Sequence, residues 1–236
     1  MRIRSGIPEV DRLEDERATP SPGLAASLDE VPTDAEALTI SRKTRRLAAL
    51  TERPFLRRII AKGVGEKELE HIGRVAGLEQ LALTATTSRD LRTLAGLSQL
   101  RILSVSVSSR LESLDGIATL ANLQMVSTWH TPKLTSIEAL ASLRQLRIVF
   151  LSGAMYKPMR LPSLRPLSEL EHLTKLHLSS VRVADGSLEP LSRLTRLRRL
   201  DLPLTFRRGE FEMLERVLPN AQGRWRLQWR HFARHS

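Results

Sequence analysis

The sequence predicts an α/β solenoid, a curved stack of short units with a parallel sheet on its concave face and short helices or 3₁₀ turns on its convex face. The apolar pattern LxxLxxLxL occurs six times, and successive copies are offset by 22, 23, 23, 27 and 24 residues. Aromatic residues make up only 4% of the chain, which fits a core of stacked aliphatic side chains. A unit of this length cannot bury its own apolar side, so neighbouring units have to stack.

Each copy of the pattern predicts one strand. The apolar positions of the six copies are Val75, Leu78, Leu81 and Leu83; Leu97, Leu100, Leu103 and Val105; Leu120, Leu123 and Val126; Leu143, Leu146, Val149 and Leu151; Leu170, Leu173, Leu176 and Leu178; Leu194, Leu197, Leu200 and Leu202. The third copy ends at Thr128, where an aliphatic residue is expected. Two weaker copies around Ile40 and Ala61 extend the array toward the N-terminus.

The segments between the strands predict the convex face. They keep an apolar residue at every third position, as in Leu91, Leu94 and Leu97, which is typical of short helical or 3₁₀ turns. The single offset of 27 residues implies a loop of about four extra residues around Tyr156. Such an insertion either marks a working face or is a tolerated surface loop.

The N-terminal segment departs from the repeat. Residues 1–33 contain four prolines and an acidic cluster at positions 14–16, with little apolar periodicity. This composition predicts a flexible or capping segment, part of which covers the open end of the solenoid. The leucine-rich array, of about eight repeats, is expected over residues 34–208.

A C-terminal cap is expected over residues 209–236. A helix is predicted from Gly209 to Leu218, where Pro219 stops it. From Arg224 to Arg230, apolar residues alternate with Arg and Gln, which predicts a half-buried strand that closes the last repeat.

The concave face carries the predicted binding site. Side chains alternate along a strand, so residues between the inward aliphatic positions line this face. Its apolar centre comprises Ile102, Met125, Trp129, Ile148 and Phe150, and its basic end comprises Lys175, His177, Arg199 and Asp201. Exposed apolar patches usually mark interaction sites. We therefore expect a protein partner, with charges that steer an acidic molecule. The alternative is that tight curvature or the folded-back N-terminal segment covers the apolar centre.

The LxxLxxLxL blocks resemble those of leucine-rich-repeat proteins, in particular the short 22-residue class of SDS22-like and internalin repeats. The resemblance covers roughly residues 34–222 and includes the downstream turns such as Leu134, Ile137 and Leu140. It implies a curved horseshoe that serves as a protein-binding scaffold. A bacterial origin is also expected, because Arg greatly outnumbers Lys.

One family feature is missing. In the family, an Asn three residues after the last strand aliphatic bonds to loop backbone and forms a ladder along the stack. The equivalent positions here are Thr86, Ser108, Thr131, Ala154, Val181 and Thr205. Hydroxyl groups can bond to local backbone, though more weakly than a carboxamide, whereas Ala and Val side chains cannot.

The charge distribution gives the alternative function. The net charge is +11, and residues 157–236 contribute +8 of it, with 16 basic and 8 acidic residues. This Arg-rich third could bind nucleic acid or another polyanion. The side chains in question are Arg193, Arg196, Arg198, Arg199, Arg207, Arg208, Arg224, Arg226 and Arg230, with Trp225 and Trp229. Against this alternative, the tryptophans are expected to face the core, and no base-reading motif is present.

Catalysis and cofactors are not expected. Ser152, His177 and Asp201 can be drawn together on neighbouring strands, but neither an oxyanion hole nor a nucleophile elbow accompanies them. The sequence has no cysteine and no metal-ligand spacing, since His231 and His235 lie in the last residues without acidic support. No apolar run approaches a membrane span or a secretory signal. We therefore expect a cytoplasmic, monomeric protein that binds neither cofactor nor membrane.

Overall fold

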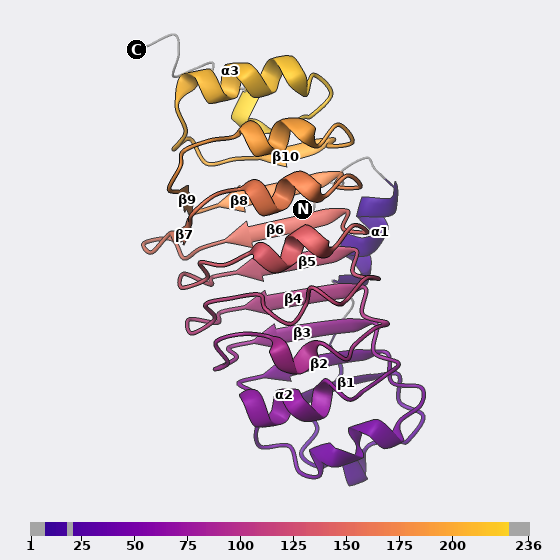
Figure 1. Ribbon diagram of the computed structural model, residues 1–236. Helices are drawn as coiled ribbons and strands as arrows, with labels where there is room; N and C mark the ends of the chain where they lie inside the picture. Colours follow the sequence, from indigo (N-terminus) through magenta and orange to yellow (C-terminus); the bar gives the residue numbers. More distant parts are fainter. Residues whose placement is uncertain (1–7, 18–20, 227–236) are drawn as a thin grey trace.

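The computed structural model describes residues 8–17 and 21–226. Eight parallel strands form one continuous sheet in chain order, and the sheet runs through the whole stack (Figure 1). The strands are β1 (Ala37–Ser41), β2 (Arg58–Lys62), β3 (Gln80–Thr84), β4 (Ile102–Ser106), β5 (Met125–Trp129), β6 (Ile148–Ser152), β8 (Lys175–Ser179) and β10 (Arg199–Asp201). The predicted solenoid is confirmed, and each copy of the pattern, including the two weaker ones, supplies one strand.

The register explains why the repeat builds a core. Inward positions pair with inward positions on the next strand, as in Leu81 with Leu103 and Leu103 with Val126. These side chains are 0–1% exposed, and they belong to one apolar cluster that extends from Leu28 to Trp225. The aliphatic columns therefore replace the separate core that a single unit cannot form.

Short helical turns cover the convex side, as predicted. They are η2 (Leu47–Glu52), α2 (Glu66–Ile72), η3 (Arg92–Leu94), η4 (Glu138–Ser142), η5 (Arg165–Glu169) and η6 (Glu189–Arg193). Proline stands in the first turn of η5 and η6, where its missing N–H leaves no helical hydrogen bond unmade. The third-position leucines of these turns point inward, and Leu94, Leu140 and Leu167 are fully buried.

The long insertion supplies one strand of a second, smaller sheet. Strands β7 (Met159–Leu161) and β9 (Val181–Val183) pair in parallel beside the main sheet. Ahead of β7 the chain turns back through a bridge between Ala154 and Lys157, and Tyr156 at the tip of this turn is 95% exposed. The extra residues therefore add one ordered strand, β7, and an exposed tip, and β9 is supplied by the next repeat.

Hydroxyl groups connect the coils in place of the missing asparagines. Thr86 Oγ1 donates to the carbonyl of Val64 at 2.9 Å, and the Thr86 amide donates to Ser108 Oγ at 3.2 Å. Where the aligned position is Ala154, Ser180 Oγ donates to the Ala154 carbonyl at 2.6 Å. The interior of the loops is thus a ladder of hydroxyl-to-backbone bonds.

Residues 21–36 cover the first coil. The short turn η1 (Leu28–Glu30) and the two residues after it place three carbonyl groups around the guanidinium of Arg53, which is only 6% exposed. That guanidinium donates to the carbonyls of Leu28 and Pro32, both at 2.5 Å, and of Val31 at 3.0 Å. One buried arginine therefore fastens the N-terminal cap to the second repeat.

The C-terminal cap is only partly as expected. Helix α3 (Arg208–Val217) lies where a helix is predicted. The predicted strand is wrong over 224–226, which are helical, and residues 227–230 lie outside the described part of the chain. Trp225 is fully buried and stacks on Phe211 with ring centroids 6.1 Å apart. The edge of the sheet is met instead by Gln222, whose carbonyl accepts the Leu200 amide at 2.8 Å.

Candidate protein-docking face

The outward residues of the strands form three columns on the concave face. The first column, at the starting ends of the strands, contains Gln80, Ile102, Met125, Ile148, Lys175 and Arg199; the second contains Ser104, Ser127, Phe150, His177 and Asp201; the third contains Thr84, Ser106 and Trp129, with Ser152 and Ser179 farther along. The residues predicted for the binding site thus lie on adjacent strands about 4.8 Å apart. The columns confirm the predicted alternation of side chains.

Helix α1 (Pro8–Arg17) lies across the first column (Figure 1). Its Leu13 is fully buried against Ile102, Met125 and Ile148, and those three side chains are 2%, 0% and 0% exposed. The expectation that these three residues form an open patch is therefore wrong. The alternative, in which the N-terminal segment folds back over the apolar centre, is the arrangement found.

Ion pairs hold α1 on both sides of Leu13. Glu14 Oε1 lies 2.6 Å from Lys175 Nζ, and these side chains are only 19% and 12% exposed. Three strands away, just before β4, Glu16 Oε2 lies 3.5 Å from Arg101 Nη2 and accepts a hydrogen bond of the same length from Gln80 Nε2. The acidic cluster of the N-terminal segment thus lies on a basic and polar strip of the sheet.

The end of α1 reaches the second column. Arg17 Nη1 donates to Ser127 Oγ at 3.0 Å, and its guanidinium lies 5.4 Å from the ring centroid of Phe150. Lys175 Nζ approaches the same ring at 5.1 Å. Two cations therefore contact the Phe150 ring, an arrangement that aromatic rings favour. Phe150 is partly covered and remains at the margin of the helix.

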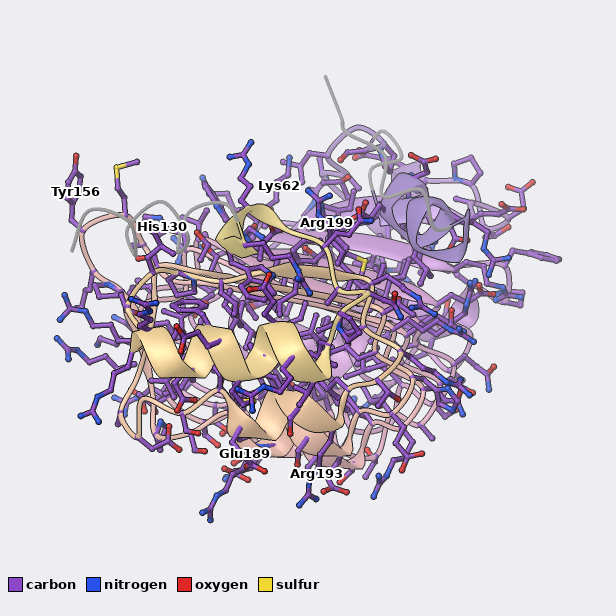
Figure 2. All side chains as sticks on the ribbon, turned by 90° about the horizontal axis from the view of Figure 1, so that it is seen from above. Lys62, His130, Tyr156, Glu189, Arg193 and Arg199 are labelled. Carbon is purple, nitrogen blue, oxygen red and sulfur yellow. The ribbon has the colours of Figure 1, made fainter. Side chains whose placement is uncertain are left out.

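Trp129 lies outside this cover. It ends β5 in the third column and is 58% exposed, and its ring lies 5.7 Å from that of His130. Figure 2 shows His130 and Tyr156 together at one edge of the structure. Of the predicted apolar centre, Trp129 is the large side chain that stays open to a partner.

The basic end of the face surrounds a pocket of about 300 Å³, lined by His177, Arg199, Asp201 and Arg224 among others. His177 Nδ1 and Arg199 Nε lie 3.5 and 3.6 Å from Asp201 Oδ2. Burial alone would raise the pKa of Asp201, but the hydrogen bond from His177, the charge of Arg199 and the Arg224 amide outweigh it and lower that pKa. Asp201 is therefore a carboxylate that neutralises part of this end, while Lys175 is already paired with α1.

The Ser-His-Asp arrangement considered from the sequence is not formed in the structure. Ser152 Oγ donates to the carbonyl of Gly153 at 3.2 Å, whereas the ring of His177 contacts Phe150 with centroids 5.6 Å apart. Among the described residues, no group of three or more His, Asp and Glu side chains is placed to hold a metal ion. His231 and His235 lie outside the described residues. The helices described also include none long and apolar enough to cross a membrane.

The Arg-rich third is divided among separate contacts. Arg208 Nε lies 2.7 Å from Glu212 Oε1, and Arg226 Nη1 lies 3.0 Å from Glu215 Oε1. Arg226 also donates to the carbonyls of Leu218 and Ala221. Trp225 faces the core, as the sequence predicts, so its ring cannot stack on a base. Trp229 lies outside the described residues.

The strength with which α1 is held follows from these contacts. Burial of one leucine contributes about 1.5–3 kcal/mol, and ion pairs near the surface contribute about 0.2–1 kcal/mol each. Ordering a ten-residue helix opposes both terms. Each inward leucine of the repeats, by contrast, packs against inward residues of the neighbouring coils. Helix α1 is therefore held on the sheet by one buried leucine and a few polar contacts, far less than what holds an inward leucine of the repeats.

Comparison with known proteins gives the class of fold. No protein-family profile and no curated protein matches the sequence. The leucine-rich-repeat domain of the type III effector XopL is 19% identical with a TM-score of 0.53, over 90% of this chain and 79% of that one. Drosophila Toll, in its complex with Spatzle, is 16% identical with a TM-score of 0.51, over 82% and 34% of the respective chains.

An internalin, InlF of Listeria monocytogenes, is also similar, with 19% identity and a TM-score of 0.47 over 72% of this chain. This chain covers 55% of that internalin's length. Together with the stacked strands and turns, the likeness to XopL and Toll defines a leucine-rich-repeat fold. At these identities the likeness extends to the fold alone.

Proposed function

We propose that the protein is a non-enzymatic scaffold that binds a partner protein through its concave face. The observation that carries this proposal is the docked helix α1. The face holds a helix of its own chain through an apolar centre, flanking ion pairs and a cation-bearing aromatic ring. A surface with this chemistry is suited to another polypeptide, since apolar anchors give affinity and charges give orientation.

The partner's contacts follow from what α1 leaves open. Trp129 offers an aromatic anchor, and the basic end at His177 and Arg199 offers charge and hydrogen bonds around its pocket. Drosophila Toll, which shares the fold, is seen in a complex with the protein Spatzle. We propose an immunity-like or adaptor-like role as a monomer. The cysteine-free composition suits the cytoplasm, and that location is part of the proposal.

Affinity capture from the native source with matched variants tests this function. We expect the wild-type chain to retain one protein at moderate salt, and Trp129→Ala combined with His177→Ala to lose at least tenfold of it. Arg193→Ala is the control, because Arg193 and Glu189 lie on the side away from the concave face in Figure 2. Equal capture by wild type and the double variant would contradict the proposal. Sequence-independent binding of nucleic acid that weakens steeply with salt would favour the polyanion alternative.

A further inference from the structure

We propose that the partner inserts an acidic, leucine-bearing helix into the site that α1 occupies. This inference rests on the proposed function and specifies its ligand. Helix α1 is then a built-in substitute for the partner helix, and the partner replaces it on the first column. The occupant is a segment with the chemistry that the first column already recognises.

The recognised pattern can be stated by position. The central leucine, Leu13, enters the depression among Ile102, Met125 and Ile148. The next residue and the third residue after it are glutamates, which reach Lys175 and Arg101 respectively. Residues three and four apart share one face of a helix, so Leu13, Glu16 and Arg17 turn toward the sheet together. A partner helix therefore needs a leucine with acidic residues one and three positions later.

The overall charges support an acidic occupant. Residues 1–33 carry 4 basic and 7 acidic residues, a net −3, whereas the whole chain carries +11, so residues 34–236 carry +14. An acidic helix is attracted to this array before contact, and a basic helix is repelled from it. A polyanion without a leucine lacks the apolar anchor and gains only the charge contribution.

Because α1 is part of the same chain, it competes with any external helix for the first column. Helix α1 ends at Arg17 and the first strand begins at Ala37, so α1 is held near the first column at a high effective concentration. A free helix must compete with it, so dislodging α1 should increase the affinity for an external helix. Leu13→Asp does this with little risk to the solenoid, because Leu13 contacts the concave face and lies outside the large aliphatic core.

The probe is a synthetic peptide with the sequence of residues 8–17, PEVDRLEDER, blocked at both ends. Its binding to full-length Leu13→Asp is measured by calorimetry or fluorescence anisotropy. We expect at least tenfold tighter binding to Leu13→Asp than to wild type, at least tenfold loss on adding Lys175→Glu, and no binding of a peptide with Ala in place of its leucine. Leu24→Asp is the matched control, since Leu24 is in the same N-terminal segment but is 58% exposed. This control should bind the peptide as wild type does.

Equal affinity for wild type and Leu13→Asp, or no binding to either, would overturn the inference. If Leu13→Asp fails to fold by circular dichroism, Glu14→Lys with Glu16→Lys dislodges α1 without touching the apolar contact and gives the same comparison. A wild-type dimer that Leu13→Asp converts to a monomer would make a second copy of the chain the occupant, and would also overturn it. If the peptide fails while the Trp129 and His177 variants still abolish capture, the proposed function stands without this ligand.

Discussion

The two ends of the strands on the concave face differ in what covers them. At the starting ends, the side chains of Ile102, Met125 and Ile148 are at most 2% exposed beneath α1, whereas at the finishing end of β5 Trp129 is 58% exposed. Both sets belong to the same repeats and point to the same side of the sheet. Repeat position therefore fixes the direction of a side chain, and a segment outside the array decides whether that side chain meets water.

The cover over the starting ends also differs from the core on the other side of the sheet. Leu103 and Ile102 are neighbours on β4, and both are buried. Leu103 belongs to the large aliphatic cluster of the stacked coils, whereas Ile102 belongs to a small cluster with Met125, Ile148 and the leucine of α1. Equal burial in this chain therefore does not mean equal stability, and the following measurements test that difference.

The largest effect is expected in the aliphatic core. Leu103→Ala should lower the free energy of unfolding by about 2–5 kcal/mol, because it leaves a cavity that neighbouring coils cannot fill. Urea denaturation of full-length protein measures this loss. Ile102→Ala, the matched change, should cost clearly less, since α1 can shift toward the smaller side chain. Equal losses would mean that α1 and the sheet form one rigid core, and would break the comparison.

Removal of the leucine of α1 should have the next largest effect. Leu13→Ala should reduce the stability of the docked helix by about 1.5–3 kcal/mol, the contribution of one buried leucine. Hydrogen exchange should then accelerate at least tenfold in the amides of residues 9–17, with little change in β3 or β4. Trp129→Ala is the control and should leave this exchange unchanged. Unaltered protection in Leu13→Ala would show that the ion pairs alone hold α1.

The ion pair between Glu14 and Lys175 should contribute less. We expect a coupling free energy of about 1 kcal/mol, at the upper end for such pairs because both side chains are mostly shielded from water. A double-mutant cycle with Glu14→Ala and Lys175→Ala measures it through the exchange of α1. The pair of Glu16 with Arg101, which is longer at 3.5 Å, serves as the internal comparison and should couple more weakly.

Asp201 should give the smallest effect, with a distinct pH dependence. Its pKa in the folded protein lies below the ordinary value of 3.8, so its stabilising contribution is present above that pH and is lost as pH falls through the folded pKa. Asp201→Asn should therefore lower stability at neutral pH by less than about 1 kcal/mol. The difference from wild type should shrink in acid below pH 3.8. A difference that does not shrink at all as pH falls below 3.8 would assign the effect to packing.

The sequence predicts the array well because its information is periodic. Each inward leucine repeats a position that its neighbours also fill, so the pairing of Leu81 with Leu103 follows from spacing alone. The columns of outward residues follow for the same reason. Spacing cannot predict that α1, a segment outside the repeat, covers the first column. Helix α1 contributes one buried leucine and has no periodic apolar face.

A signal for that cover was nevertheless present in the charges. Net −3 over residues 1–33 stands against +14 over the remainder, and the three consecutive carboxylates at 14–16 follow Leu13 directly. Alternation misled the prediction at the other end. Trp225 alternates with arginine residues as one side of a strand would, but it lies in a helical turn and stacks on Phe211. Tertiary packing decides which side chain a large aromatic ring contacts. The alternation of apolar and polar residues in the sequence carries no information about that contact.

The hydroxyl ladder inside the loops has a chemical consequence. Asparagine is thermolabile, and a carboxamide ladder would place such a residue in every coil. Here Thr86, Ser108 and Ser180 make the bonds between coils instead, and the whole chain contains only Asn122 and Asn220. The interior of this horseshoe should therefore age without deamidation, and charge changes in a long-lived or heated sample should be found at those two exposed asparagines.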